Sequence, residues 1–259
     1  MKILIIGDVV GRAGRNIIQQ ELTNLKSKYQ VDITIANCEN ASGGNGLTEK
    51  NAKEFFENGV DIITMGNHVW DKKDIVNYID DYTNLIRPAN YPDPCPGKGY
   101  TIFEKNGIKI GVINISGIVY LNNLICPFTT IDAILEEISS KCKIIILDFH
   151  GEATSEKIAM GYYSDGRVSL VYGTHTHVQT ADKRILPQGT GYITDVGMTG
   201  PFDGVLGVDK DIIIQHLKSR RPVKFEIATG IMQINGLYVE INEKTGKCEA
   251  IDNFIKVIE

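Results

Sequence analysis

The chain has 259 residues, 42% of them hydrophobic and 23% charged, and its formal net charge is −5 at pH 7. The length allows a sizeable buried core, and the acidic balance argues against a broad basic surface for extended nucleic acid. The five cysteines are scattered without a C-x-x-C pair, which argues against a structural zinc site or a disulfide framework. No stretch approaches the length of a membrane span, and the N-terminal apolar run is too short for a signal peptide. We therefore expect a cytoplasmic protein without a membrane partner.

The first third of the chain alternates strand and helix signals. Buried strands are predicted over residues 2–7, 32–36 and 61–66, and amphipathic helices over residues 14–29 and 47–59. This alternation implies a parallel sheet whose loops gather at the carboxyl ends of the strands.

The rest of the chain adds further strands, helices and turns. Residues 88–96 hold four of the eight prolines and are predicted to form an irregular loop. The predicted turns are Asn106-Gly107, Asn235-Gly236 and Thr245-Gly246; helices are predicted over 130–141 and 154–163, and strands over 144–149 and 167–173. No repeat or linker divides the chain, so we expect a single domain over residues 1–259, with helices outside and two sheets inside.

Polar residues of types that can bind metals come shortly after five of the predicted strands. They are Asp8; Glu39 and Asn40; Asn67 and His68; His150; and His175 and His177. Because the carboxyl ends of parallel strands converge on one crevice, we expect these side chains to lie together. We interpret the set as a metal centre rather than as a coincidence of polar strand ends.

His175 and His177 alternate along one segment of the chain. In an extended backbone, residues i and i+2 point to the same face, so we expect the two imidazoles to project together. The alternative is a polar strand end with two solvated histidines.

The number of candidate ligands indicates the kind of site. Seven residues are too many for one tetrahedral zinc, but they suit two ions bridged by a carboxylate. The candidate ligands are Asp8, Glu39, Asn40, Asn67, His150, His175 and His177. Glu39 is the expected bridge because it is the central carboxylate, and Cys38 beside it is expected to face the core. Nitrogen and oxygen ligands without thiolate favour iron or manganese over zinc.

The order of these motifs resembles the calcineurin-like metallophosphoesterases. That superfamily usually begins with D-x-H, whereas this chain has Val10 at the third position, and Asn40 stands in for a missing histidine ligand. The variant pattern resembles the YmdB family of bacterial metallophosphoesterases. The matching runs include "IGDVVGR", "NCENASGG", "TMGNHVWD", "DFHGEATSEK", "GRVSLVYGTHTHVQTAD" and "YITDVGMTGP".

The resemblance implies an α/β fold, namely a four-layer α/β/β/α sandwich. It also implies an enzyme that hydrolyses phosphodiesters, in particular 2′,3′-cyclic nucleotides. A hydroxide bridging two iron or manganese ions would attack in line, and the protein would be a homo-oligomer, a dimer or a tetramer. One ion would be held by Asp8, Asn40 and His177, the other by Asn67, His150 and His175, and Glu39 would be shared. His68 would be the proton donor; the alternatives are an eighth ligand or a hydrogen-bonding residue beside the metals.

Two other functions are compatible with the same centre. One is a phosphomonoesterase or nuclease, and the other is a regulatory protein that senses a nucleotide and turns it over only incidentally. Among the remaining residues, Trp70 either stacks on a base or packs in the core, and Arg87 is a candidate substrate contact. Glu152 is expected to accept a ring N–H from a ligating histidine, and His216 is expected to have no catalytic part.

Overall fold

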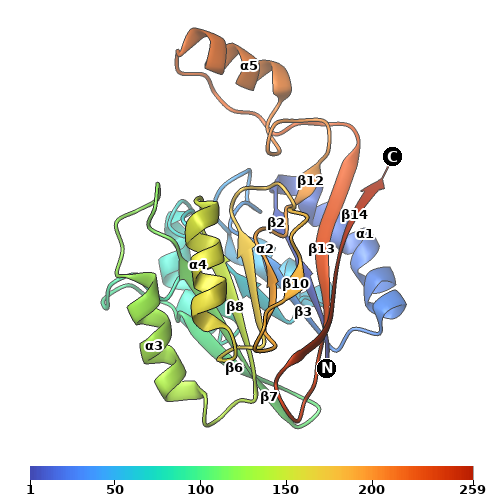
Figure 1. Ribbon diagram of the computed structural model, residues 1–259. Helices are drawn as coiled ribbons and strands as arrows, with labels where there is room; N and C mark the ends of the chain where they lie inside the picture. The colour runs from blue at the N-terminus through green and yellow to red at the C-terminus, as the bar shows by residue number, and fades with distance from the viewer. Residues whose placement is uncertain (259) are drawn as a thin grey trace.

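Two β-sheets lie face to face in the computed structural model, which describes residues 1–258 (Figure 1). The first sheet has the strand order β2-β12-β13-β1-β3-β4-β5, and β14 pairs with β13. Its strands are β1 (Lys2–Ile6), β2 (Asp8–Val9), β3 (Ile33–Asn37), β4 (Ile62–Thr64), β5 (Leu85–Ile86), β12 (Met198–Pro201), β13 (Met232–Ile241) and β14 (Cys248–Ile258). Strands β1, β3, β4 and β5 are parallel to one another, as the strand-helix alternation predicted.

The second sheet has the order β10-β11-β9-β8-β7-β6. Its strands are β6 (Tyr100–Lys105), β7 (Ile108–Ser116), β8 (Ile144–His150), β9 (Leu170–Thr174), β10 (Arg184–Ile185) and β11 (Gly191–Ile193). Strands β7, β8, β9 and β11 are parallel, and the predicted turn at Asn106-Gly107 joins the antiparallel pair β6 and β7.

Helices cover the outer face of each sheet, which gives four layers. The helices are α1 (Gly11–Tyr29), α2 (Glu49–Glu57), α3 (Pro127–Ile138), α4 (Thr154–Ser164) and α5 (Lys210–Ser219), with short 3₁₀ turns at Lys73–Asn77 and Ile79–Asp81. Buried side chains of α1 and α2 pack on the first sheet, and those of α3 and α4 pack on the second. A third apolar cluster, rich in isoleucine, fills the space between the sheets. The predicted α/β/β/α sandwich is therefore confirmed.

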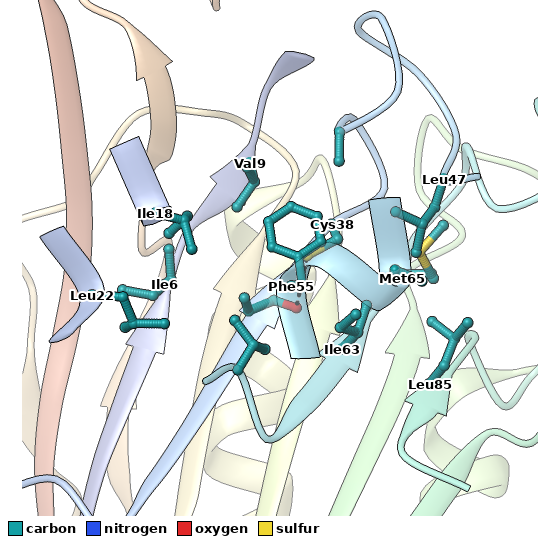
Figure 2. Close-up of a cluster of buried hydrophobic side chains, with 14 of the residues drawn as sticks. Ile6, Val9, Ile18, Leu22, Cys38, Leu47, Phe55, Ile63, Met65 and Leu85 are labelled. Atoms are coloured by element: carbon teal, nitrogen blue, oxygen red, sulfur yellow. Dashed lines mark hydrogen bonds between the residues drawn. The ribbon is translucent and has the colours of Figure 1, made fainter. Parts of the chain in front are cut away.

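The helix-covered face of the first sheet buries Cys38, as Figure 2 shows. Cys38 lies in the same apolar cluster as Phe55 of α2 and Met65, which follows β4. The carboxylate of its neighbour Glu39 instead faces His150 and the backbone of His68. The prediction that Cys38 is a core thiol is therefore confirmed.

One predicted turn is wrong. Asn235-Gly236 lies in the middle of β13, where Gly236 pairs with Ile6 on one side and Phe254 on the other. A Cβ atom at residue 236 would lie 2.4 Å from the Phe254 ring, so the glycine makes room for an aromatic side chain of the neighbouring strand.

Helix α5 stands away from the sandwich, beyond the end that carries β12 and β2 (Figure 1). None of its residues is buried, and His216 near its end hydrogen-bonds the carbonyl of Arg221 through Nδ1, at 2.8 Å. Within residues 1–258, no helix combines the length and the apolar character that crossing a membrane requires.

Candidate metal centre

The predicted polar residues lie at the carboxyl ends of strands from both sheets. Asp8, Glu39 and Asn67 follow β1, β3 and β4 of the first sheet, whereas His150 and His175 come from β8 and β9 of the second. The predicted side chains therefore come together, as expected, but from two sets of parallel strands rather than one. The apolar layer between the sheets aligns their edges, and the candidate site lies where the two edges meet.

His150 is fully buried, and hydrogen bonds fix the role of each ring nitrogen. Nδ1 lies 2.9 Å from Oγ1 of Thr174, and that hydroxyl lies 2.7 Å from Oδ1 of Asp148. Since the carboxylate only accepts, Thr174 donates its proton to Asp148 and accepts the Nδ1–H of His150. The Nε2 atom of His150 is therefore the one that faces the site.

Three potential ligand atoms surround Nε2 of His150. Oδ1 of Asn67 lies at 2.9 Å, Oε1 of Glu39 at 3.1 Å and Nδ1 of His175 at 3.1 Å. Ligand atoms of Glu39, His150 and His175 all lie within 4.8 Å of one another. A single proton on Nε2 can be donated to only some of these three acceptor atoms. The arrangement of acceptors around one point therefore fits a bound cation.

A second group of ligand atoms lies beside the first. The Nδ1 atom of His177 lies 3.1 Å from the carbonyl of Leu206, to which it donates, so Nε2 carries the lone pair. That Nε2 atom lies 3.3 Å from Oδ1 of Asn40, whose amide nitrogen donates to the carbonyl of Gly44 at 2.8 Å. Oδ1 of the fully buried Asp8 has no hydrogen-bond partner among the described residues. These unpaired oxygen and nitrogen atoms also fit a cation.

The titration of these groups reflects burial among unlike charges. Burial raises the pKa of the Asp8 carboxyl to about 6. Burial also opposes ionisation of Glu39 and His150, but their mutual attraction lowers the pKa of Glu39 to about 2 and raises that of His150 to about 9. Burial, followed by the charge on His150, lowers the pKa of His175 to about 3. These opposing shifts show that unlike charges are held together away from water in the centre, a setting that suits a positive ion.

The histidine turn, residues 174–178, differs from the extended segment that the sequence predicted. Strand β9 ends at Thr174, and the φ angles of His175 and His177 are 98° and 63°, in the left-handed region. The expectation of two rings on one face of a strand is wrong. His175 points toward His150, and its Nε2 lies 3.1 Å from Oε2 of Glu152, the predicted acceptor of a ring N–H. The ring of His177 points toward Asn40 instead.

His68 lies at the edge of the centre. Its backbone N–H donates to Oε2 of Glu39 at 2.8 Å, and its side chain is 36% exposed. The ring Nδ1 lies 2.8 Å from Oδ2 of Asp71, which leaves Nε2 as the ring nitrogen free to act. The backbone of His68 is thus hydrogen-bonded to a candidate ligand, Glu39, whereas its ring is hydrogen-bonded to Asp71 beside the centre.

Sequence reasoning missed three residues that orient the predicted ones: Asp71, Asp148 and Thr174. Asp148 had a usable signal, since it is a charged residue in an apolar strand, two positions before His150 and hence on the same face. For Asp71, the only sequence signal of a contact with His68 was its position three residues further along the chain.

Arg87 and Trp70 are both engaged in the fold. Arg87 is 7% exposed, and its guanidinium donates to the carbonyls of Pro88, Cys95 and Pro96 in the proline-rich loop. The ring of Trp70 contacts that of Tyr91 edge to face, with 5.7 Å between the ring centroids, and packs against the apolar cluster between the first sheet and helices α1 and α2. Core packing, one of the two expectations for Trp70, therefore holds, and Arg87 serves to fold the loop.

Helix-covered paired sheets, with histidine, carboxylate and amide groups where the sheet edges meet, define a protein of the calcineurin-like metallophosphoesterase class. The chain belongs to the family of YmdB-like proteins, whose model matches residues 4–254. It is 51% identical over 255 residues to a 2′,3′-cyclic-nucleotide 2′-phosphodiesterase of Bacillus subtilis (strain 168), covering 98% of this chain and 97% of the relative.

Two solved structures share the fold over nearly the whole chain. A novel phosphatase from Mycoplasma pneumoniae superposes with a TM-score of 0.94 at 38% identity, covering 99% of this chain and 93% of that one. A hypothetical protein from Thermus thermophilus superposes with a TM-score of 0.93 at 36% identity, covering 99% of both chains. The predicted family is therefore confirmed.

Proposed function

We propose that this protein is a metal-dependent phosphodiesterase that hydrolyses 2′,3′-cyclic nucleotides. The observation that carries the proposal is the convergence of Glu39, His150 and His175, whose ligand atoms lie within 4.8 Å where the two sheets meet. The name of the Bacillus subtilis relative supports the reaction, because its similarity extends over 98% of the chain.

The centre takes two metal ions in this proposal. Asp8, Asn40 and His177 hold one ion, Asn67, His150 and His175 hold the other, and Glu39 is shared. The two groups of facing lone pairs support this division. Iron is the favoured metal and manganese the second choice, because the donors are nitrogen and oxygen without thiolate. When bound, the ions supply positive charge for the phosphoryl oxygens and an activated water.

His68 supplies the proton in this reaction. As water adds to phosphorus and loses a proton to solvent, the bond from phosphorus to the ribose O2′ breaks. The departing oxygen takes a proton from Nε2 of His68, which is then reprotonated from solvent. Asp71 holds Nδ1 of the ring, and the backbone bond to Glu39 keeps the residue beside the reacting phosphate. The product is a nucleoside 3′-phosphate.

The charge of the substrate is met mainly by the metals. The net charge of the chain is −5, and the guanidinium of Arg87 is occupied by three carbonyls. Lys157, another buried cationic side chain, is paired with Asp195. This arrangement favours a small nucleotide over an extended nucleic acid.

A turnover assay tests the proposal against its alternatives. Protein stripped of metal and reloaded with Mn²⁺ is incubated with 2′,3′-cyclic AMP, and the expected product is 3′-AMP. Faster hydrolysis of 3′-AMP itself would indicate a phosphomonoesterase, and cleavage of a short RNA would indicate a nuclease. Binding of the cyclic nucleotide without turnover by the reloaded protein would instead indicate a nucleotide sensor.

We also propose a homo-oligomer, a dimer or a tetramer. The exposed helix α5 supports this, because Ile214 and Leu217 on it are 50% and 55% exposed and favour a covered position. Sedimentation velocity of the wild-type protein tests the assembly, and a monomer at micromolar concentration would contradict it.

A further inference from the structure

A buried ion pair lies behind the histidine turn. Lys157 of α4 and Asp195, which follows β11, are each 1% exposed, and Nζ lies 2.6 Å from Oδ2. Buried ion pairs gain little net stability over apolar side chains of the same volume, because both charges lose their water. This pair therefore calls for a role other than holding the core together.

Asp195 binds the residue that separates the two histidines of the turn. Its Oδ2 atom accepts from the backbone N–H of Thr176 at 3.1 Å and from the Thr176 hydroxyl at 2.8 Å. Its Oδ1 atom accepts from the backbone N–H of Gly197 at 2.8 Å. With Lys157, the carboxylate receives four donors, two of which belong to Thr176 in the turn.

The turn needs such a restraint because its backbone is unfavourable. His175 and His177 both have positive φ, which residues with a Cβ atom adopt only when their surroundings impose it. Thr176 lies between them, so its two bonds to Asp195 hold the backbone on either side. The directions of both imidazoles follow from these backbone angles.

The path of Lys157 to Asp195 runs past the ends of the central strands. A Cβ atom at Gly173 of β9 would lie 3.1 Å from Cδ of Lys157 and 1.8 Å from the carbonyl oxygen of Thr194. A Cβ atom at Gly151, just after β8, would lie 3.7 Å from Cε of Lys157. The absence of a side chain at Gly173 therefore leaves the lysine room to reach the carboxylate behind the turn.

We propose that Lys157 and Asp195 are a positioning pair for the metal centre. Asp195 imposes the left-handed turn through Thr176, and Lys157 supplies the counter-charge that keeps the buried carboxylate in place. His175 and His177 lie in the two separate groups of ligand atoms, so a single ion pair sets the geometry of both halves. This inference rests on the two-metal centre proposed above.

Replacing Asp195 by asparagine tests the inference. The new side chain has a single acceptor oxygen, so it cannot serve Thr176 and Gly197 together, and it leaves Lys157 without a counter-charge. The measurement is titration of metal-free protein with Mn²⁺ by calorimetry. We expect the affinity for both ions to fall about 10–100-fold in Asp195→Asn, the usual size of the effect when a group that orients a ligand is lost.

Asp165→Asn is the matched control. Asp165 is also buried and accepts from the backbone N–H groups of Gln188 and Thr190, but it lies at the opposite end of β9 and β11. The control should lose thermal stability while binding both ions with wild-type affinity. Equal loss of metal affinity in both variants would reduce Asp195 to a general structural role and overturn the inference.

Thr176→Val covers the case in which Asp195→Asn fails to fold. The change removes the hydroxyl bond alone, so both metal affinities should fall by a smaller factor, and Thr176→Ser should restore them. Hydrogen exchange of the amides of residues 175–178 in metal-free protein provides a second readout. It should accelerate in Thr176→Val and stay at the wild-type rate in Thr176→Ser.

Two results separate this inference from the proposed function. If the wild-type protein binds no Mn²⁺, the two-metal centre itself fails, and hydrogen exchange still decides whether Asp195 holds the turn. If the wild type binds two ions and Asp195→Asn or Thr176→Val binds them equally well, the positioning role is wrong. Loss of only one ion would also contradict it.

Discussion

Oδ2 of Asp71 lies 2.8 Å from Nδ1 of His68, so the ring of His68 is oriented by a carboxylate outside the metal centre. The backbone N–H of the same histidine donates to Oε2 of Glu39. One contact places the residue and the other directs its ring, which leaves Nε2 available to the substrate. This geometry supports the proposed proton-transfer role of His68 and places its ring on Asp71 rather than on a candidate ligand.

The first prediction concerns the leaving group. His68→Ala should keep both metals, because its ring is hydrogen-bonded to Asp71, which is not one of the candidate ligands. Hydrolysis of 2′,3′-cyclic AMP should fall about 10²–10⁴-fold, since the ribose oxygen leaves poorly without an acid, whereas a nitrophenyl diester should react at close to the wild-type rate. Metal analysis and the two rates are the measurements.

Two patterns would contradict this role. Loss of metal together with both rates would make His68 a ligand, and loss of both rates with metal retained would make it a phosphate-positioning residue. Asp71→Asn serves as a graded companion, because it keeps the shape of the partner but weakens the orientation of the ring. Its loss on the cyclic nucleotide should be smaller than that of His68→Ala.

The second prediction concerns Gly66, which gives the centre its space. A Cβ atom at residue 66 would lie 2.3 Å from Nε2 of His150 and 2.5 Å from Oε2 of Glu39. Gly66→Ala should therefore displace these two side chains and abolish metal binding and turnover. The control is Gly107→Ala in the β6–β7 hairpin, which meets nothing within 4 Å but carries a positive φ of 77°. Gly107→Ala should lose some stability and keep its metals. The steric argument is wrong if Gly66→Ala keeps its metals, or if Gly107→Ala loses metal while Gly66→Ala does not.

The position of the candidate ligands was largely predictable because the signal is local. Asp8, Glu39 and His150 each lie at or within two residues of the end of an apolar strand, which is visible in the sequence, and strand ends in a parallel sheet must gather at one edge. The same rule could not show that two sheets share the site, because sheet stacking depends on side chains far apart in the chain. That these residues bind metal is still a prediction.

The errors arose where distant residues override local pattern. His175 and His177 were predicted to be extended, but both have positive φ, and Thr176 between them is hydrogen-bonded to Asp195. Asn235-Gly236 has the composition of a hairpin turn, yet its backbone pairs with strands on both sides. In both cases the decisive contact comes from a part of the chain that the pattern does not include.

The third prediction concerns the tautomer of His150. Thr174→Val keeps the volume of the side chain but removes the hydroxyl that links Nδ1 of His150 to Asp148. The buried N–H loses its acceptor, which should cost about 1–3 kcal/mol of stability in metal-free protein, measured by urea unfolding. Metal affinity should fall about 10–100-fold, since the ring is no longer oriented. Thr174→Ser should restore both values, and wild-type affinity in the valine variant would show that Thr174 does not set the tautomer.

The last prediction tests Glu39 as the shared ligand. Glu39 is 1% exposed, and its two oxygens face different partners, Oε1 toward His150 and Oε2 toward the backbone of His68. Glu39→Gln keeps the size of the side chain and removes its charge, so the content of both metals should fall together. Asp8→Asn should deplete mainly one ion, because the proposed division assigns the Asp8 carboxylate to the same ion as Asn40 and His177. Elemental analysis after dialysis measures the two contents. If each variant loses one ion and keeps the other, Glu39 serves a single metal, and the carboxylate bridge must be sought elsewhere.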